Sequence, residues 1–364
     1  MRQDYKVIQQ KIPLPFKVKK GILSLGAQTK NSICFAQGNF AYLSRLHQDL
    51  SYPPDFNNFE RDVKFFLKKN PRVIAYDLHP EYQSTKFALE LEAKGRRLRA
   101  IQHHHAHIAS CMAENKLKNQ KVIGVAFDGT GLGDDGKIWG AEFLITDYKN
   151  FKRKAHLKEI PLLGGERAIL EPWRLLLAWG ILPENINART QKILKKMQIK
   201  GINAPLASSM GRLFDAAASL ILKRNEANFE AQLAIELEKL ASRVKEHKEA
   251  SYNFKITKLD NYIIDPHPMF KEIIADLKAG KPKEEIAYRL HLTVAQMIAR
   301  ICLILKRENK INKVVFSGGC FQNKLLTRLA LGLLEREGFQ VFTHKKLSST
   351  DQNISLGQCL IAGS

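Results

Sequence analysis

Four histidines within five residues are the clearest candidates for chemistry in this 364-residue sequence. They form the run His103-His104-His105-Ala106-His107, which leads into an apolar stretch with helical spacing. His103 and His107 are four residues apart, so on a helix their rings lie on one face and can share a metal. Histidine nitrogen suits zinc or iron. The competing interpretation is a polyhistidine surface patch, but the direct continuation into an apolar helix favours a metal site.

Two aspartates are candidates to complete such a site, because two imidazoles seldom form a catalytic centre alone. Asp128 ends the apolar strand 121–128, where an unpaired carboxylate would be costly. Asp351 lies in a loop before the last helix, where helix capping is the alternative role. His104 and His105 point away from the metal-binding pair, and we expect them to face the substrate, with one acting as general base, or to support the ligands.

Two glycine-rich segments indicate phosphate binding. Gly129 and Gly131 belong to the expected turn 129–136, and Gly318 and Gly319 lie between a strand and a helix. Backbone amides in such turns bind oxyanions. Each segment alone is weak evidence, but together they predict a nucleotide held between two lobes.

Strands and helices alternate along the chain, which predicts an α/β protein with mixed sheets. The segment 166–245 is mostly helical by its apolar periodicity, and 284–306 is a long amphipathic helix. We expect three parts: an N-terminal lead, a first lobe with the histidine motif, and a second lobe with a helical insertion. Their expected boundaries are 1–20, 21–150 and 151–364.

Composition narrows the class of protein further. The net charge of +22 attracts polyanions, although lysine-rich solvated faces are the simpler interpretation. The basic residues lack interleaved aromatic residues, so nucleic acid is not the expected partner. Five scattered cysteines predict reduced thiols. The sequence shows no run of eighteen apolar residues and no secretory signal at its start, which predicts a cytosolic protein without a membrane span.

Several long motifs, taken in order, resemble the HypF family of carbamoyltransferases. They are IQHHHAHIASCMAEN, VAFDGTGLGDDGKIWGAEFL, EPWR, SSMGRLFDAAASL, FSGGCFQNKLL and TDQNISLGQ. SLGAQTKNSICF and AYDLHPEYQST are similar to the opening segments of the same part of the family. The resemblance extends from about residue 20 to the end of the chain.

This resemblance implies the C-terminal half of HypF, with an actin-like ATPase (ASKHA) fold of two lobes. It implies carbamoyl transfer from carbamoyl adenylate to the C-terminal cysteine of HypE, with release of AMP, in nickel–iron hydrogenase maturation. It implies one divalent metal, zinc or iron, on the ligand set His103, His107, Asp128 and Asp351. Nucleotide contacts are implied for Gly318, Gly319 and Asn323, and ribose contacts for Asp215 and Glu230.

Departures from the family pattern concern both the extent of the chain and local motifs. The part that makes carbamoyl adenylate has no counterpart here, so we expect a separate adenylate-forming domain or protein to supply it. The family's Asp-Gly-Gly is Asp351-Gln352-Asn353, and its Glu-Gly-Gln is Glu230-Ala231-Gln232. We expect Asn353 to tolerate a left-handed backbone, whereas Gln352 has the bulk to crowd the metal.

Three alternative functions remain open on the sequence. A tRNA threonylcarbamoyl transferase would suit the positive charge, but that group typically has Met-Glu-Gly between its ligand histidines. An O-carbamoyltransferase acting on a small hydroxylated molecule is the second. The third is a non-catalytic scaffold that binds HypE or a nucleotide.

Overall fold

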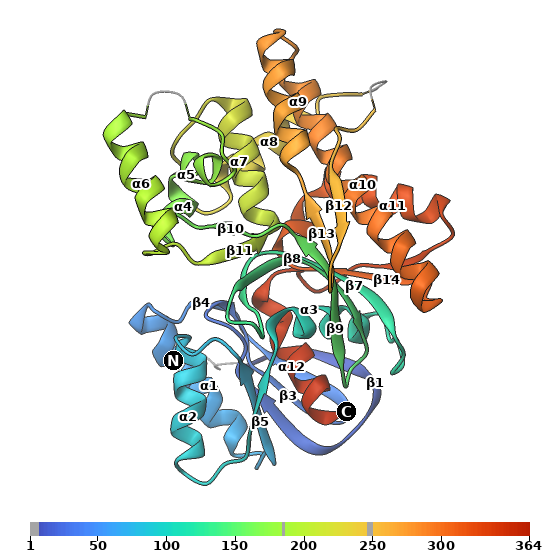
Figure 1. Cartoon of the computed structure of the whole chain (residues 1–364). Helices are drawn as coiled ribbons and strands as arrows, with labels where there is room; N and C mark the ends of the chain where they lie inside the picture. Colours follow the sequence, from blue (N-terminus) through green and yellow to red (C-terminus); the bar gives the residue numbers. More distant parts are fainter. Residues whose placement is uncertain (1–6, 184–185, 246–249) are drawn as a thin grey trace.

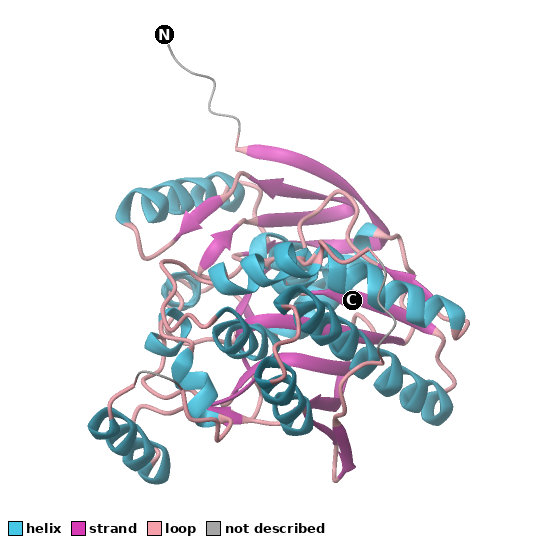
Figure 2. Ribbon diagram, turned by 90° about the horizontal axis from the view of Figure 1, so that it is seen from above, coloured by secondary structure: helices cyan, strands magenta, loops and turns pink. Residues whose placement is uncertain are grey.

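Two mixed β-sheets divide the molecule, and helix α3 (His103–Glu114) lies between them, as the computed structural model shows (Figure 1). The structure describes residues 7–183, 186–245 and 250–364. The view from above shows helices packed over the strands, with the long strand β1 at the N-terminal end (Figure 2). The expected α/β class, with two lobes built on mixed sheets flanked by helices, is confirmed.

The first sheet has the order β3-β1-β5-β6. Strand β1 pairs with β3 in antiparallel register and with β5 in parallel register, and β5 pairs with β6 in parallel. Helices α1 and α2 pack on one face through an aromatic core that includes Phe59 and Phe87. Helix α12 packs on the other face. The bounds are β1 Ile8–Ser24, β3 Cys34–Ser44, β5 Val73–Asp77, β6 Leu98–Ile101, α1 Pro53–Leu67, α2 Gln83–Glu92 and α12 Ile354–Gly363; β2 Thr29–Asn31 and β4 His47–Asp49 form a separate pair.

The second sheet has the order β12-β13-β9-β8-β7-β14-β15, with β10 and β11 joined at β8. Its strands are β7 Val122–Leu132, β8 Ile138–Thr146, β9 Phe151–Leu157, β10 Ile160–Pro161, β11 Leu206–Ser209, β12 Lys255–Lys258, β13 Tyr262–Asp265, β14 Lys313–Ser317 and β15 Gln340–Phe342. Its helices are α4 Arg167–Leu170, α5 Trp173–Ala178, α6 Ala188–Lys200, α7 Met210–Leu222, α8 Gln232–Ala241, α9 His267–Lys278, α10 Lys283–Asn309 and α11 Lys324–Arg336, with two short 3₁₀ turns, η1 Gly319–Gln322 and η2 Asp351–Asn353. The helical segment expected at 166–245 is therefore confirmed, interrupted by β11.

Helix α10 is long and apolar enough, by length and composition, to cross a membrane. However, 61% of its apolar window is buried, and the helix packs against α8, α9 and α11. This is the pattern of a core helix, because its apolar side chains are already covered by protein.

The expected boundaries at residues 20 and 150 do not coincide with those of the sheets. Residues 8–20, expected in the lead, are the first part of β1, which pairs with β3; residues 1–6 lie outside the described part of the chain. Strands β7 and β8, expected in the first lobe, belong to the second sheet because β7 pairs with β14 from the other end of the chain. Conversely, α12 packs on the first sheet. These pairings join segments far apart in sequence, so local patterns do not reveal them.

Candidate metal centre and nucleotide cleft

The candidate metal ligands meet because the parallel strands of both sheets end at the same cleft. Asp77 ends β5, and the neighbouring strand β6 leads directly into α3 and His103. Asp128 lies in β7, beside the end of β14 at Ser317. Ligand sites of open α/β sheets form outside the carboxyl ends of their strands.

Asp128 is aimed at α3 by a bulge in β7. Residue Phe127 pairs with Ala141 and Gly131 with Trp139, so three residues of β7 face one of β8. Gly140 is the single opposing residue, and a Cβ there would lie 2.7 Å from the Asp128 carbonyl oxygen. Bulges of this kind redirect a side chain next to active sites. The expected glycine turn at 129–136 is therefore wrong: Gly129 and Gly131 are extended strand, and the turn starts at Gly133, whose N–H donates to the Lys137 carbonyl.

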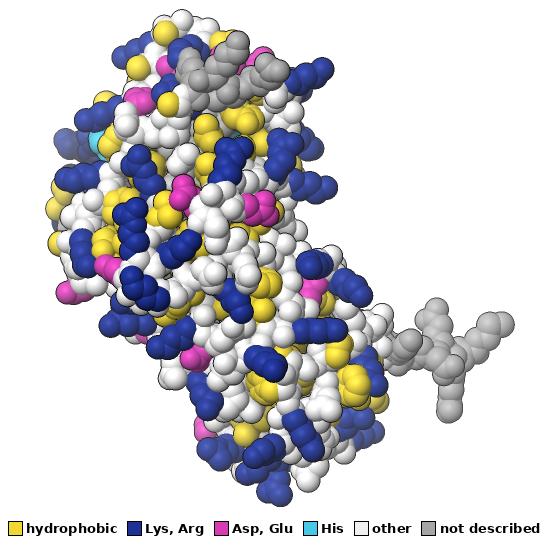
Figure 3. Space-filling view, turned by 90° about the vertical axis from the view of Figure 1, so that its right-hand side faces the viewer, with side chains coloured by type: hydrophobic (Ala, Val, Ile, Leu, Met, Phe, Trp, Pro, Cys, Tyr) yellow, Lys and Arg dark blue, Asp and Glu magenta, His cyan; other side chains and the backbone are white. Residues whose placement is uncertain are grey.

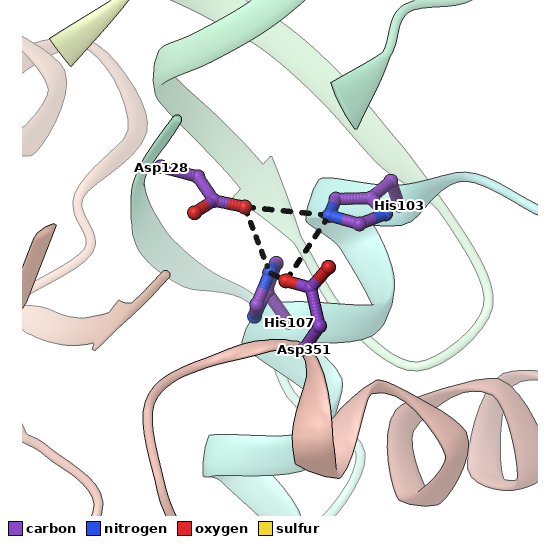
Figure 4. A group of neighbouring side chains, drawn as sticks. All are labelled: His103, His107, Asp128 and Asp351. Carbon is purple, nitrogen blue, oxygen red and sulfur yellow. Dashed lines mark hydrogen bonds and ion pairs between the residues drawn. The ribbon is translucent and has the colours of Figure 1, made fainter. Parts of the chain in front are cut away.

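All four expected metal ligands converge (Figure 4). Their ligand atoms lie within 4.8 Å of one another. Nε2 of His103 lies 3.4 Å from the Asp128 carboxylate and 3.7 Å from that of Asp351. Nε2 of His107 lies 3.3 Å and 3.4 Å from the same two groups. Both imidazoles are buried and Asp351 is the most exposed member. The four residues come from three segments: α3 carries both histidines, β7 carries Asp128 and η2 carries Asp351.

These separations fit a metal better than direct hydrogen bonding. Zinc binds nitrogen and oxygen at about 2.0–2.1 Å, and the edge of a tetrahedron of that size is about 3.3–3.4 Å. By contrast, the true hydrogen bond between His103 Nδ1 and Asp77 measures 2.8 Å. The donor set of two imidazoles and two carboxylates suits zinc or iron. The four residues therefore fit one divalent cation.

Charge around the ligands also favours a cation. Burial opposes protonation of His103, but surrounding carboxylates, led by Asp77, outweigh it and raise the pKa of the imidazole well above its usual range. Burial would raise the pKa of Asp128, but hydrogen bonds from His103 and His107 lower it well below the usual range. The carboxylate of Asp128 is thus ionised, and it also accepts the Gly319 N–H at 3.1 Å.

Two supporting residues were missed in the sequence. Asp77 accepts from Nδ1 of His103, and Ser317 Oγ lies 3.3 Å from Nδ1 of His107. Hydrogen bonds of this kind orient a ligand histidine. Asp77 had the same signal as Asp128, an acid at the end of an apolar strand, whereas Ser317 carried none.

His104 and His105 are not brought into the cleft, contrary to the expected substrate-facing role. Gln102 caps α3 by accepting the His105 N–H, so its amide NH₂ donates to Nδ1 of His104. His104 then carries its proton on Nε2, which has no hydrogen-bond partner among the described residues. Burial lowers the pKa of His104 well below its usual range and that of His105 to about 4. Nε2 of His105 donates to the Asp147 carbonyl, and neither histidine lines the cleft.

The loop carrying Asp351 accommodates its departures from the family pattern without strain. Asn353 has φ −112°, not a left-handed conformation, so the expected need for one is absent. Its amide donates to the Ser348 carbonyl at 2.6 Å. Gln352 lines a different pocket, beside Arg45 and Lys346, and its carbonyl accepts from Ser32. It does not crowd the metal ligands.

A cleft of about 650 Å³ begins at Asp128 and Asp351 and extends along α7 and α8. Several residues expected to bind nucleotide line it: Gly129, Asp215, Glu230, Gly319 and Asn323. Gly131 and Gly318 do not line it. A Cβ at Gly131 would lie 2.6 Å from the His104 ring, and one at Gly318 would lie 2.2 Å from the Phe127 carbonyl oxygen, so both glycines permit close packing. At Gly318, φ is +102°, which only glycine adopts readily.

Arg212 is the residue of the cleft that the sequence analysis missed. It is 1% exposed, and its Nε lies 2.9 Å from Oδ2 of Asp215, without hydrogen-bond geometry. Nη2 donates to Glu230, whereas Nη1 has no partner among the described residues. Burial, partly offset by Arg212, raises the pKa of Asp215 to about 6. The SSMGRLFDAAASL motif contained Arg212 three residues before Asp215, the spacing of neighbours on one helix face.

Basic residues are spread over both lobes on the face in Figure 3. Several basic residues that are distant in the sequence line one pocket of about 630 Å³. This pocket lies beyond the amino ends of β5 and β6, away from the cleft. Its basic lining residues are Lys17, Lys19, Lys20, Arg97, Arg99 and Lys149. The fold therefore concentrates charge that is dispersed along the chain.

Comparison with known proteins assigns the family. Residues 17–114 match the HypF Kae1-like domain, and residues 124–358 match the second subdomain of the carbamoyltransferase Kae1-like domain. A carbamoyltransferase HypF homolog of Cupriavidus necator is 31% identical over 94% of this chain and 91% of its own length. The chain belongs to the HypF carbamoyltransferase family. The carbamoyltransferase HypF of Rhodobacter capsulatus is 34% identical over 96% of this chain and 48% of its own length.

Solved structures of the HypF family agree with this assignment. The crystal structure of full-length HypF in the phosphate- and nucleotide-bound form superposes with a TM-score of 0.91 and 40% identity, covering 99% of this chain and 48% of that one. HypF of T. kodakarensis gives a TM-score of 0.86 at 29% identity, covering 97% and 48%. The chain thus spans about half the length of most of the HypF proteins that it matches. The likeness to HypF expected from the motifs is confirmed.

Proposed function

We propose that this chain transfers a carbamoyl group from carbamoyl adenylate to a cysteine thiol of an acceptor protein. By the family resemblance, the acceptor is a HypE-like protein and the thiol is that of its C-terminal cysteine. The observation that carries the proposal is one cleft with the converging ligands Asp128 and Asp351 at one end and Arg212 with Asp215 at the other. A protein of this kind acts in the cytosol.

The metal end would hold zinc or iron through His103, His107, Asp128 and Asp351. When bound there, the cation supplies Lewis-acid polarisation of a carbonyl or phosphate oxygen. Asp77 keeps the His103 ring oriented, since a carboxylate can only accept its Nδ1 proton.

The other end would hold the nucleotide. A volume of about 650 Å³ is within the usual range for a small-molecule site. Phe214 and Phe229 supply apolar surface for a base, and the carboxylates of Asp215 and Glu230 can accept hydrogen bonds from ribose hydroxyls. Gly319 leaves the entrance to Asp128 open, although its N–H is already donated to that residue.

The reaction balances without an oxidant or reductant. The acceptor thiol loses its proton to solvent, because the thiolate is the nucleophile. Its sulfur forms a bond to the carbamoyl carbon, and the bond from that carbon to the phosphate oxygen breaks. The products are an S-carbamoyl cysteine and AMP, which leaves with the electron pair of the broken bond.

The source of carbamoyl adenylate is proposed to be a separate adenylate-forming domain or protein. The basic surface would attract both an anionic intermediate and an acidic acceptor, so the rate of association should fall as salt rises. Cations on both lobes are visible in Figure 3.

Mass spectrometry of the acceptor tests this function. Incubation with pre-formed carbamoyl adenylate should add one carbamoyl group to the terminal cysteine, whereas carbamoyl phosphate with ATP should add little. His107→Ala should abolish transfer, and His105→Ala, on the same helix but directed at Asp147, should retain it. An unmodified acceptor in the presence of carbamoyl adenylate and loaded protein would refute the proposal.

A further inference from the structure

A buried hydrogen-bonded chain leads from the metal ligand His107 to the far end of its own helix. Nδ1 of His107 lies 3.3 Å from Oγ of Ser317, which lies 3.0 Å from Nε2 of His344. Nδ1 of His344 lies 2.8 Å from the carboxylate of Glu114, the last residue of α3. Side chains of His344 and Glu114 are 4% and 9% exposed, so water competes little for these bonds.

The donor and acceptor of every hydrogen bond in this series follow from its last residue, Glu114. A carboxylate can only accept, so Nδ1 of His344 must carry the proton and Nε2 is left with a lone pair. Ser317 then donates to His344, which leaves its oxygen to accept from Nδ1–H of His107. With a proton on Nδ1, His107 can offer its Nε2 lone pair to a cation bound between Asp128 and Asp351; without the cation, Nε2 can donate to Asp128 instead.

Glu114 also anchors the loop that carries Asp351. Its Oε1 accepts the backbone N–H groups of Lys345, Lys346 and Leu347 at 3.0, 2.5 and 3.2 Å. These contacts, with the bond from His344, hold the pKa of Glu114 at about 2 against the effect of burial. The Glu114 carboxylate therefore contacts His344, which supports His107, and the loop that carries Asp351. These two candidate ligands are more than two hundred residues apart in the sequence.

We infer that Glu114 is a positioning residue for the metal centre, which sets the tautomer of His107 through His344 and Ser317 and fixes the loop of Asp351. This inference rests on the metal centre of the proposed function. Without a carboxylate at position 114, His344 can move its proton to Nε2 and reverse every bond. His107 would then carry its proton on the nitrogen that faces the metal.

Zinc affinity measured by competition with a chelator tests the inference. Supporting residues of this kind typically contribute 10- to 100-fold in affinity, and Glu114→Gln should weaken zinc binding by about tenfold. Ser317→Ala removes the hydrogen bonds between His107 and His344 without changing the contacts of the 345–347 loop, and it should weaken zinc binding at least as much. The fold-loss of zinc affinity in the double variant should be smaller than the product of the two single fold-losses, because both substitutions interrupt the same series of hydrogen bonds. Glu335→Gln, an exposed glutamate near the end of α11, is the control and should bind as wild type.

Long-range ¹H–¹⁵N spectra of the metal-free protein provide a readout independent of zinc. Nδ1 of His107 should carry a proton in the wild type, whether or not Nε2 is also protonated toward Asp128, and it should lose that proton in part in Glu114→Gln and Ser317→Ala. Unchanged zinc affinity and an unchanged His107 tautomer in both variants would overturn the inference. A wild type that binds no zinc would instead contradict the metal centre, and the spectra would still test the chain of bonds.

Discussion

The two ends of the cleft differ in how far the protein satisfies its own polar groups. At the metal end, each ligand nitrogen faces a carboxylate and is supported from behind, by Asp77 for His103 and by Ser317 for His107. At the Arg212 end, Nε and Nη1 of the arginine and Oδ2 of Asp215 are buried without hydrogen bonds among the described residues. Unsatisfied buried polar groups are costly, and native proteins hold few of them.

The difference indicates two modes of ligand recognition in one cleft. The metal end is preorganised, since its geometry is set by buried helices and strands. The Arg212 end keeps unused hydrogen-bonding capacity, so a polar ligand is expected to complete it. Arg212 lies beside Asp215 and Glu230, and ribose or phosphate oxygens are groups that could satisfy its free donor.

The largest expected effect is at the metal end. His107→Ala should lose most of the roughly one metal ion per chain that the four-ligand site predicts, because it removes one of two nitrogen ligands. Elemental analysis of the purified protein measures the metal content per chain, and His105→Ala is the matched control. Equal metal content in wild type and His107→Ala would contradict the metal site.

Nucleotide binding should be the next largest effect. AMP at a hundred times its Kd stabilises the native state by about 2.7 kcal/mol, which raises Tm by several degrees. Gly319→Val should abolish this shift, because its Cβ would lie 3.0 Å from Asp128 at the cleft wall. The matched control is Gly332→Val, where a Cβ meets nothing within 4 Å. Thermal melts in the presence of a chelator separate this effect from metal loss, and a shift that persists in Gly319→Val would place the nucleotide elsewhere.

An effect of similar size is expected from the pH dependence of Asp215. Its pKa of about 6 lies above the unfolded value of 3.8, so the folded state binds the proton more tightly. Stability from this group is therefore present at low pH and is lost as pH rises from about 4 to 6, by an amount on the order of 3 kcal/mol. Asp215→Asn lacks this loss, so its Tm relative to wild type should increase between pH 4 and pH 7. A Tm difference that is constant over this range would show that Asp215 titrates normally.

The smallest expected effect is at Ala231, beside Glu230. Ala231 has φ +63°, a left-handed conformation that costs non-glycine residues roughly 1 kcal/mol. Alanine in place of the family's glycine is therefore strained at this position. Ala231→Gly should raise Tm by one or two degrees in calorimetry, while Ala234→Gly within α8 should lower it.

The sequence by itself determined the family and the alternation of strands and helices, and it predicted the four candidate metal ligands, with Asp351 implied by the resemblance. These features are local: the spacing of His103 and His107 places them on one helix face, and Asp128 follows an apolar run. The motifs around them are long enough to identify HypF without any structure.

Only the tertiary structure decided what surrounds those residues. His103 and His107 both face Asp128 and Asp351, whereas His104 meets Gln102 and His105 meets the Asp147 carbonyl, because the helix that carries all four is buried on all sides. Ser317, His344 and Glu114 carry no local signal, since their bonds join segments up to 230 residues apart. The bulge at Asp128 and the pairing of β7 with β14 likewise depend on partner strands that no sequence window contains.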